Sequence, residues 1–202
     1  MATLEYAPNG ITIRTTQPKE FYEDNQWHEL DGARYFVPLT KTELKECEDK
    51  EHCVTSFITD MSNLFQNRLF IGDKTFNQPI GSWDTSRVRY MDGMFKECSK
   101  FNQPIGAWDT SQVKDMKYMF QYADSFNQPI GAWNTGRVLN MHGMFYGATV
   151  FNQPIGSWDT GEVGDMTCMF ESATSFNQPI GEWDTSSVFS MSGMLCDATT
   201  FC

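Results

Sequence analysis

The sequence predicts an α/β repeat solenoid in which 25-residue coils each contribute a short strand and a short helix. The run Phe-Asn-Gln-Pro-Ile-Gly begins at residues 76, 101, 126, 151 and 176, always 25 residues apart. A fixed period of this length is typical of solenoids, because each repeat buries its apolar face only when neighbouring repeats stack on it. Large apolar residues recur at the same interval and are expected to form internal columns, which begin at Phe76, Ile80, Trp83, Val88, Met91 and Met94.

The second half of each coil predicts a helix, over residues 88 to 98 in the first full coil. Its apolar residues follow the spacing of one helical face, and Thr85 and Ser86 precede it as candidate N-caps. The methionines belong to this pattern, so they are expected in the core rather than on a soft, Met-rich binding surface. In the first half, Pro79 excludes a helix, and a brief strand is expected from Ile80 to Thr85.

Two polar columns accompany the apolar ones. Asn77 and its counterparts are expected to satisfy backbone groups at a turn. Asp84 and its counterparts are expected to accept backbone N–H bonds where the helix begins. A row of calcium ions is the alternative for the aspartates. Asn134 interrupts that row, and the sequence lacks the closely spaced Asp-X-Asp motifs of calcium-binding β-rolls. Neither a metal nor another cofactor is therefore expected.

Residues 51–202 are expected to form the solenoid, with one degenerate and five regular coils, and residues 1–50 its N-terminal cap. The segment 53–65 aligns with 83–95, and five additional residues before Phe76 predict a bulging loop. Within the cap, residues 10–14 alternate like a strand, and residues 27–37 predict a hairpin turning at Asp31-Gly32. Residues 40–48 predict a short helix capped by Thr40 or Thr42.

The six cysteines lack a metal-binding spacing. Cys98 stands in an alanine column and Cys53 in the tryptophan column, so both are expected to face the core. Two pairs can each close a short loop by a disulfide, Cys47 with Cys53 and Cys196 with Cys202. Six reduced thiols are the alternative.

The net charge of −11 argues against nucleic acid and against an anionic membrane surface as partners. No stretch of apolar residues is long enough to span a membrane. The first residues have neither a basic n-region nor an apolar h-region, so no signal peptide is expected.

Two motifs carry a family resemblance: Phe-Asn-Gln-Pro-Ile-Gly-Ser-Trp-Asp-Thr-Ser and Val-X-X-Met-X-X-Met-Phe, which recur from Cys53 onward. They closely resemble the repeats of BspA-like surface proteins, which are also found in mycoplasma lipoproteins and in marine bacteria, protists and algae. The resemblance implies a leucine-rich-repeat-like α/β solenoid at the cell surface or secreted, with a binding or adhesion role and no catalytic residues. This chain departs from the family pattern because it shows neither a signal peptide nor a lipobox.

The sequence favours two kinds of function and argues against a third. The first is a non-enzymatic module that binds protein or glycan through columns that vary between coils, since packing does not constrain them; drift on a solvated face is the alternative for any single residue. The second is a structural subunit of a filament, shell or larger complex, assembled end to end through its last coil. An enzyme is not expected, because no histidine lies in a nucleophile–base motif. The candidate binding residues are Arg87, Arg89, Tyr90, Lys117, Tyr118, Tyr122, Arg137, His142, Tyr146 and Phe189.

Overall fold

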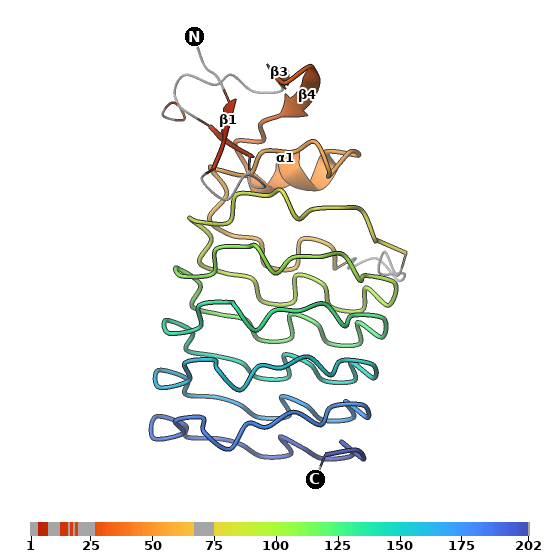
Figure 1. The fold of residues 1–202 in the computed structure, drawn as a ribbon, viewed down its shortest axis with the longest axis vertical. Helices are drawn as coiled ribbons and strands as arrows, with labels where there is room; N and C mark the ends of the chain where they lie inside the picture. The colour runs from red at the N-terminus through yellow and green to blue at the C-terminus, as the bar shows by residue number, and fades with distance from the viewer. Residues whose placement is uncertain are drawn as a thin grey trace.

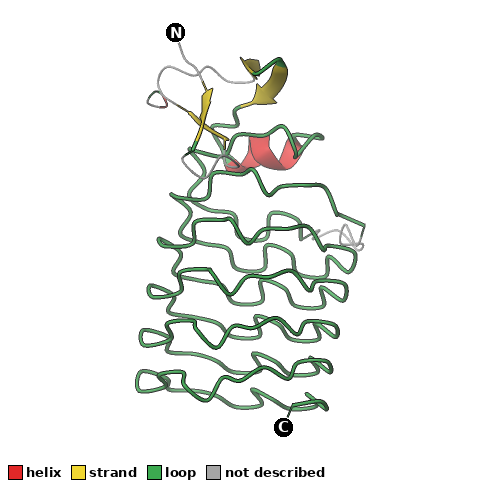
Figure 2. Cartoon of the chain, in the orientation of Figure 1, coloured by secondary structure: helices red, strands yellow, loops and turns green. Residues whose placement is uncertain are grey.

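The computed structural model describes residues 4–7, 13–15, 17, 19, 27–66 and 75–201. Near the N-terminus, β1 (Leu4–Tyr6) pairs antiparallel with β2 (Ile13–Thr15). The latter covers the end of the strand expected at 10–14, whose first three residues lie outside the described part. The described residues 50–66 and 75–201 wind as a stack of coils, with β1, the β3–β4 hairpin and helix α1 at one end of the stack (Figures 1 and 2).

The predicted hairpin is confirmed. Strands β3 (Trp27–Leu30) and β4 (Ala33–Phe36) pair antiparallel. Asp31 and Gly32 between them have φ of 51° and 80°, the pair of positive angles that a two-residue type I′ turn requires.

The predicted short helix is confirmed as α1 (Lys41–Glu46). Its N-cap is Thr40, whose hydroxyl accepts the Glu43 backbone N–H at 3.2 Å. The Glu43 carboxylate in turn accepts the N–H of Leu39 at 2.7 Å. Both contacts satisfy amides that have no partner inside the helix.

The helix expected in each coil is not observed in the described residues. An α-helix needs amides bonded four residues back and negative φ throughout. Here alternate amides bond to the next coil instead: Met91 N donates to Asp115 O at 3.0 Å and Gly93 N to Lys117 O at 2.8 Å. The intervening amides close turns three residues back within the coil. Positive φ at Gly93 (59°) and Glu97 (64°) interrupts any helix, so residues 88–98 form successive turns.

The strand expected from Ile80 to Thr85 is also not observed. Trp83 N bonds Ile80 O at 3.2 Å, which closes a turn rather than a ladder. The β-pairing between coils consists of isolated parallel bridges, for example Tyr90 with Asp115 and Asp115 with Asn140. The loop expected before Phe76 lies at residues 67–74, outside the described part.

The predicted apolar columns form one continuous core. Most of their members are fully buried, including Val88, Met91, Met94 and the residues aligned with them, and Cys53 and Cys98 also lie in this core. Phenylalanine and tryptophan rings stack between coils with centroids about 6 Å apart, as Trp108 on Trp133 at 6.5 Å. Burial decreases in the coil that starts at Phe176, where Met191 is 45 % exposed.

On the Asn-Gln-Pro side, side chains join one coil to the next. Asn77 Oδ1 accepts the N–H of Asn102 at 2.9 Å, and this bond recurs along the column. Trp108 Nε1 donates to Ile80 O at 3.1 Å, and the later tryptophans repeat it. The Thr85 hydroxyl donates to Asp109 O at 3.0 Å. The asparagine prediction is thus confirmed for backbone satisfaction, although this column lies near the surface.

The aspartate column also behaves as predicted in one respect. Asp109 Oδ1 accepts the N–H of Ser111 at 2.9 Å, and the corresponding bond is present at Asn134 and Asp159. The carboxylate closes a turn two residues ahead and does not cap a helix. An amide oxygen makes the same bond, so Asn134 closes the same turn in its coil.

Candidate functional site

The variable strip is the side of the stack formed by positions 87, 89, 90, 92, 93, 96 and 97 and their equivalents every 25 residues. Here backbone hydrogen bonds join every pair of neighbouring coils, whereas the side-chain bonds between coils differ from one pair to the next. Tyr118 N donates to His142 O at 2.8 Å, and Lys114 N donates back to Arg89 O at 2.9 Å. Since every residue except proline supplies these groups, the outward side chains of this strip are not required for stacking.

Two columns of the variable strip have left-handed backbone. At the position of residue 93 they hold Asn63, Gly93, Tyr118, Gly143, Cys168 and Gly193, and at the position of residue 97 they hold Glu97, Tyr122, Gly147, Ser172 and Asp197. Tyr118 and Tyr122 have φ of 56° and 55°, which is uncommon for an aromatic residue.

Glycine in the following coil makes room for each of these tyrosine rings. A Cβ at Gly143 would lie 2.7 Å from the Tyr118 ring, and a Cβ at Gly147 would lie 2.5 Å from the Tyr122 ring. Both distances are too short for a real Cβ atom, so an alanine there would displace the ring. The tyrosines therefore depend on the residue 25 positions later.

Tyr118 begins a polar chain that crosses three coils. Its hydroxyl lies 2.6 Å from His142 Nε2, and His142 Nδ1 lies 3.3 Å from the Asp165 carboxylate. Burial raises the pKa of Tyr118, and the charge of Asp165 acts in the same direction. For Asp165, burial raises the pKa, but hydrogen bonds from Thr167 and His142 outweigh it and lower the value. The Lys96 ammonium lies 5.2 Å from the centre of the Tyr118 ring.

A second aromatic contact lies beside the first. The rings of Tyr122 and Tyr146 meet edge to face, with centroids 5.1 Å apart. A hydrogen bond with Tyr122 raises the pKa of Tyr146 to about 12. Tyr122 is 43 % exposed and presents its ring to solvent.

The structure brings five of the ten predicted binding residues into one region, the aromatic cluster: Lys117, Tyr118, Tyr122, His142 and Tyr146. The aromatic cluster also includes Lys96, Asp115 and Asp165, which were not predicted. The sequence could have indicated Asp165, because this residue occupies the same repeat column as Tyr90, one of the predicted binding residues.

The other five predicted residues lie elsewhere on the variable strip. Arg87 covers the Phe57 ring at 6.0 Å, and Arg137 donates to Gln112 Oε1 at 2.9 Å. Arg89 and Tyr90 are exposed on the coil that precedes the coil of Tyr118. Phe189 is 80 % exposed, with its ring 2.8 Å from the position that a Cβ of Gly164 would take.

The sulfur atoms of one predicted cysteine pair, Cys47 and Cys53, lie 2.6 Å apart. Both residues are free thiols in the structure. Cys196 is an exposed free thiol, and Cys202 falls outside the described residues, so the second pair is not placed. Among the described residues, no group of three or more histidine, cysteine or acidic side chains is arranged to hold a metal ion. None of the described helices is long and apolar enough to cross a membrane.

Stacked coils with one constant and one variable side define a repeat protein. A model of the family described as "Mycoplasma protein of unknown function, DUF285" matches residues 38–148 and 129–202. These matches span well over half of the sequence, and the chain belongs to this family. This match confirms the resemblance to mycoplasma repeat proteins that the sequence motifs indicated. Comparison with curated proteins and with solved structures gave no match.

Proposed function

We propose that this chain is a leucine-rich-repeat-like solenoid of the BspA-like type. In this proposal it acts as a non-enzymatic binding or adhesion module, and the variable strip contacts a protein or glycan. The observation that carries the proposal is the backbone pairing on that strip, where Tyr118 N donates to His142 O and Tyr122 N to Tyr146 O. Side chains not needed for stacking are free to be selected for recognition.

The aromatic cluster supports a contact surface in particular. Tyrosine buries a large area with few rotatable bonds, and it is enriched among residues that dominate binding energy. Tyr118 and Tyr122 are held against the glycines of the next coil, so their rings are already ordered before a ligand arrives. Lys117, Asp115 and Asp165 around them add charge-assisted hydrogen bonds.

The test compares two double variants of the chain on a glycan array and a displayed-peptide library. The strip variant carries Tyr122→Asn and Tyr146→Ala, since asparagine tolerates the left-handed backbone at position 122. The control carries Val150→Ala and Ser157→Ala, exposed positions outside the strip. We expect the wild type and the control to bind the same probes and the strip variant to lose at least tenfold in affinity. Equal binding by the two variants would contradict the proposal.

Self-association is the alternative function, and the exposure of Phe189 (80 %) and Met191 (45 %) supports it. Light scattering over a concentration series under reducing conditions distinguishes it from the first proposal. A constant mass near 23.2 kDa would exclude self-association, and a mass that grows with concentration and returns to the monomer value in Phe189→Ser would favour it.

A further inference from the structure

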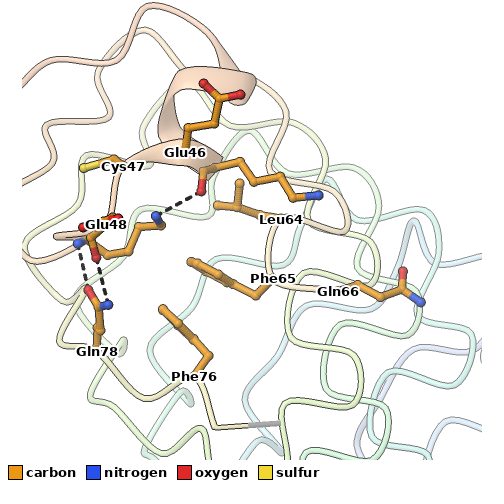
Figure 3. A pocket seen from close by; sticks show the side chains of 10 residues that line it. Glu46, Cys47, Glu48, Leu64, Phe65, Gln66, Phe76 and Gln78 are labelled. Carbon is orange, nitrogen blue, oxygen red and sulfur yellow. Dashed lines mark hydrogen bonds between the residues drawn. The ribbon is translucent and has the colours of Figure 1, made fainter. Parts of the chain in front are cut away.

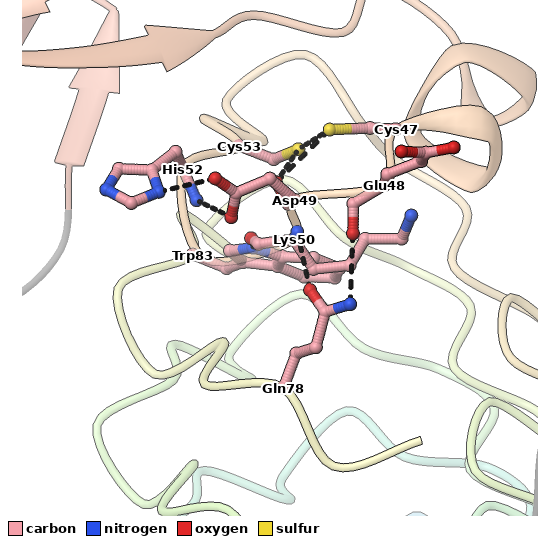
Figure 4. Close-up of polar contacts among 8 residues, drawn as sticks. All are labelled: Cys47, Glu48, Asp49, Lys50, His52, Cys53, Gln78 and Trp83. Carbon is pink, nitrogen blue, oxygen red and sulfur yellow. Dashed lines mark hydrogen bonds and ion pairs between the residues drawn. The ribbon is translucent and has the colours of Figure 1, made fainter. Parts of the chain in front are cut away.

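Cys47 and Cys53 meet at the junction between α1 and the stack. Cys47 is the C-cap of α1, and Cys53 forms a parallel bridge with Phe36 at the end of the hairpin. Their Sγ atoms lie 2.6 Å apart, and each thiol lies 3.2 Å from the carbonyl oxygen of Asp49 (Figure 4). The junction thiols, as we call this pair, therefore face each other across the loop 48–52.

This loop is held by contacts that do not involve sulfur. Gln78 binds it from the first full coil: its Oε1 accepts the N–H of Lys50 at 2.8 Å, and its Nε2 donates to Glu48 O at 2.9 Å (Figure 4). Trp83 Nε1 donates to Lys50 O at 2.7 Å. Two groups held together by the surrounding fold react with each other much faster than with a solute at ordinary concentration.

We propose that the junction thiols are a site of thiol–disulfide exchange, in which a small-molecule disulfide such as oxidised glutathione converts them to an intramolecular disulfide. The Cys47 thiolate attacks one sulfur of the small molecule, forms a mixed disulfide and releases one small thiolate. The Cys53 thiol then gives its proton to a base in solution and attacks Cys47 Sγ. The Cys47–Cys53 bond forms and the second small thiolate leaves. Two protein thiols are oxidised and one small disulfide is reduced to two thiols.

The environment assigns the attacking role to Cys47. It is partly exposed and lines a cavity of about 400 Å³ beneath the end of α1, whereas Cys53 is only 2 % exposed (Figure 3). The hydrogen bond from Cys53 lowers the pKa of Cys47 to about 7, and the charge of Lys50 acts in the same direction. The same hydrogen bond, together with burial, raises the pKa of Cys53. The exposed thiol of the pair is thus the one ionised near neutral pH.

The other described cysteines lack this combination. Cys98 is 1 % exposed, so a solute does not reach its sulfur. A hydrogen bond with Glu171 raises the pKa of Cys168 to about 11, and the charge of Asp197 raises the pKa of Cys196. Cys98 therefore serves as an internal control, and Cys168, Cys196 and Cys202 are best removed for the measurement.

The experiment uses the full chain carrying Cys168→Ser, Cys196→Ser and Cys202→Ser. The folded protein is equilibrated with mixtures of oxidised and reduced glutathione, quenched, alkylated and weighed by mass spectrometry. We expect Cys47 and Cys53 to become protected together, without retained glutathione, while Cys98 is alkylated only after unfolding. If both thiols stay alkylatable in the most oxidising mixture, or if glutathione remains on Cys47 beside a free Cys53, the proposal is wrong.

A matched pair of variants separates the two roles. Cys53→Ala in the same background should retain one glutathione on Cys47, because no second thiol displaces it. Cys47→Ala should react at least tenfold more slowly, since the remaining thiol is buried. The pH dependence of Cys47 alkylation in Cys53→Ala should show a midpoint above 7, because the hydrogen-bond donor that lowers the pKa of Cys47 is then absent. Circular dichroism of each variant checks that it is folded, and equal reaction rates of the two alanine variants would overturn the assignment.

Discussion

The two sides of each coil are joined to the neighbouring coils by different kinds of hydrogen bond. On the Asn-Gln-Pro side, side chains join neighbouring coils: Asn127 Oδ1 accepts Asn152 N, and Trp133 Nε1 donates to Ile105 O. On the variable strip, backbone amides and carbonyls make the connection that recurs in every coil, as between Tyr118 N and His142 O. A bond made by a side chain requires one residue type in every coil, whereas a bond made by the backbone accepts many. The difference explains why one side repeats almost unchanged and the other does not.

The largest test of this comparison is the replacement of a tryptophan. Trp133 is buried, stacks on the rings before and after it and donates to Ile105 O at 3.1 Å. Trp133→Ala should lower the free energy of unfolding by about 3–5 kcal/mol in urea titrations. The matched control, Tyr146→Ala on the variable strip, should change it by about 0.5 kcal/mol. Similar losses for both variants would show that the two sides are equally constrained.

A second test adds one methyl group at a close approach between two coils. A Cβ at Gly106 would lie 2.5 Å from Pro129 O in the next coil, whereas a Cβ at Gly181 meets nothing within 4 Å. Gly106→Ala should therefore destabilise the chain by about 1–3 kcal/mol. Gly181→Ala is the control and should be neutral or slightly stabilising. Thermal unfolding of both variants decides the point, and the prediction fails if the midpoints fall together.

A third test removes one rung of the asparagine column. Asn127 Oδ1 accepts both Asn152 N at 2.9 Å and Gln153 Nε2 at 3.0 Å. Asn127→Ala should lower the free energy of unfolding by about 1 kcal/mol, because the column lies near the surface and water replaces part of these bonds. Lys114→Ala, whose backbone bond to Arg89 O survives, should change stability by no more than about 0.5 kcal/mol. Urea titration of the two variants tests whether only the side-chain bond matters.

The smallest expected effect concerns the left-handed backbone of the variable strip. Ser172 has φ of 59°, in the region that glycine adopts without steric cost. Ser172→Gly should stabilise the chain by about 0.5 kcal/mol, because relief of the left-handed strain exceeds the additional entropy that glycine loses on folding. Ser111→Gly, at a position without positive φ, should destabilise it by about 0.5–1 kcal/mol. Opposite shifts of the unfolding midpoint would support this account, and shifts of the same sign would refute it.

The sequence predicted which residues are buried but not the local structure that buries them. The spacing of Val88, Met91, Met94 and Cys98 is that of a helical face, and all four are in the core. Successive turns closed three residues back produce nearly the same spacing, so apolar periodicity alone does not distinguish them from a helix. The amide bonds to the next coil decide between the two, and they exist only once coils stack.

The sequence predicted some residues of the aromatic cluster but not the contacts between them. Variation between coils pointed to Tyr118, Tyr122 and His142, because residues that change in a repeat are not held by packing. It did not reveal that Tyr118 contacts His142 or that His142 contacts Asp165, which depends on side-chain direction. The dependence of each tyrosine on a glycine 25 residues later also became visible only from the Cβ positions.

The sequence by itself determined the repeat length, the buried columns, the β3–β4 hairpin and the N-capped helix α1. Each of these follows from local chemistry or from a side chain recurring at one interval. The tertiary structure decided how the coils join, because nearly every residue type supplies the backbone groups that form these hydrogen bonds. It also brought Cys47 and Cys53 together and ordered the aromatic cluster, since both depend on where the chain places atoms that are apart in sequence.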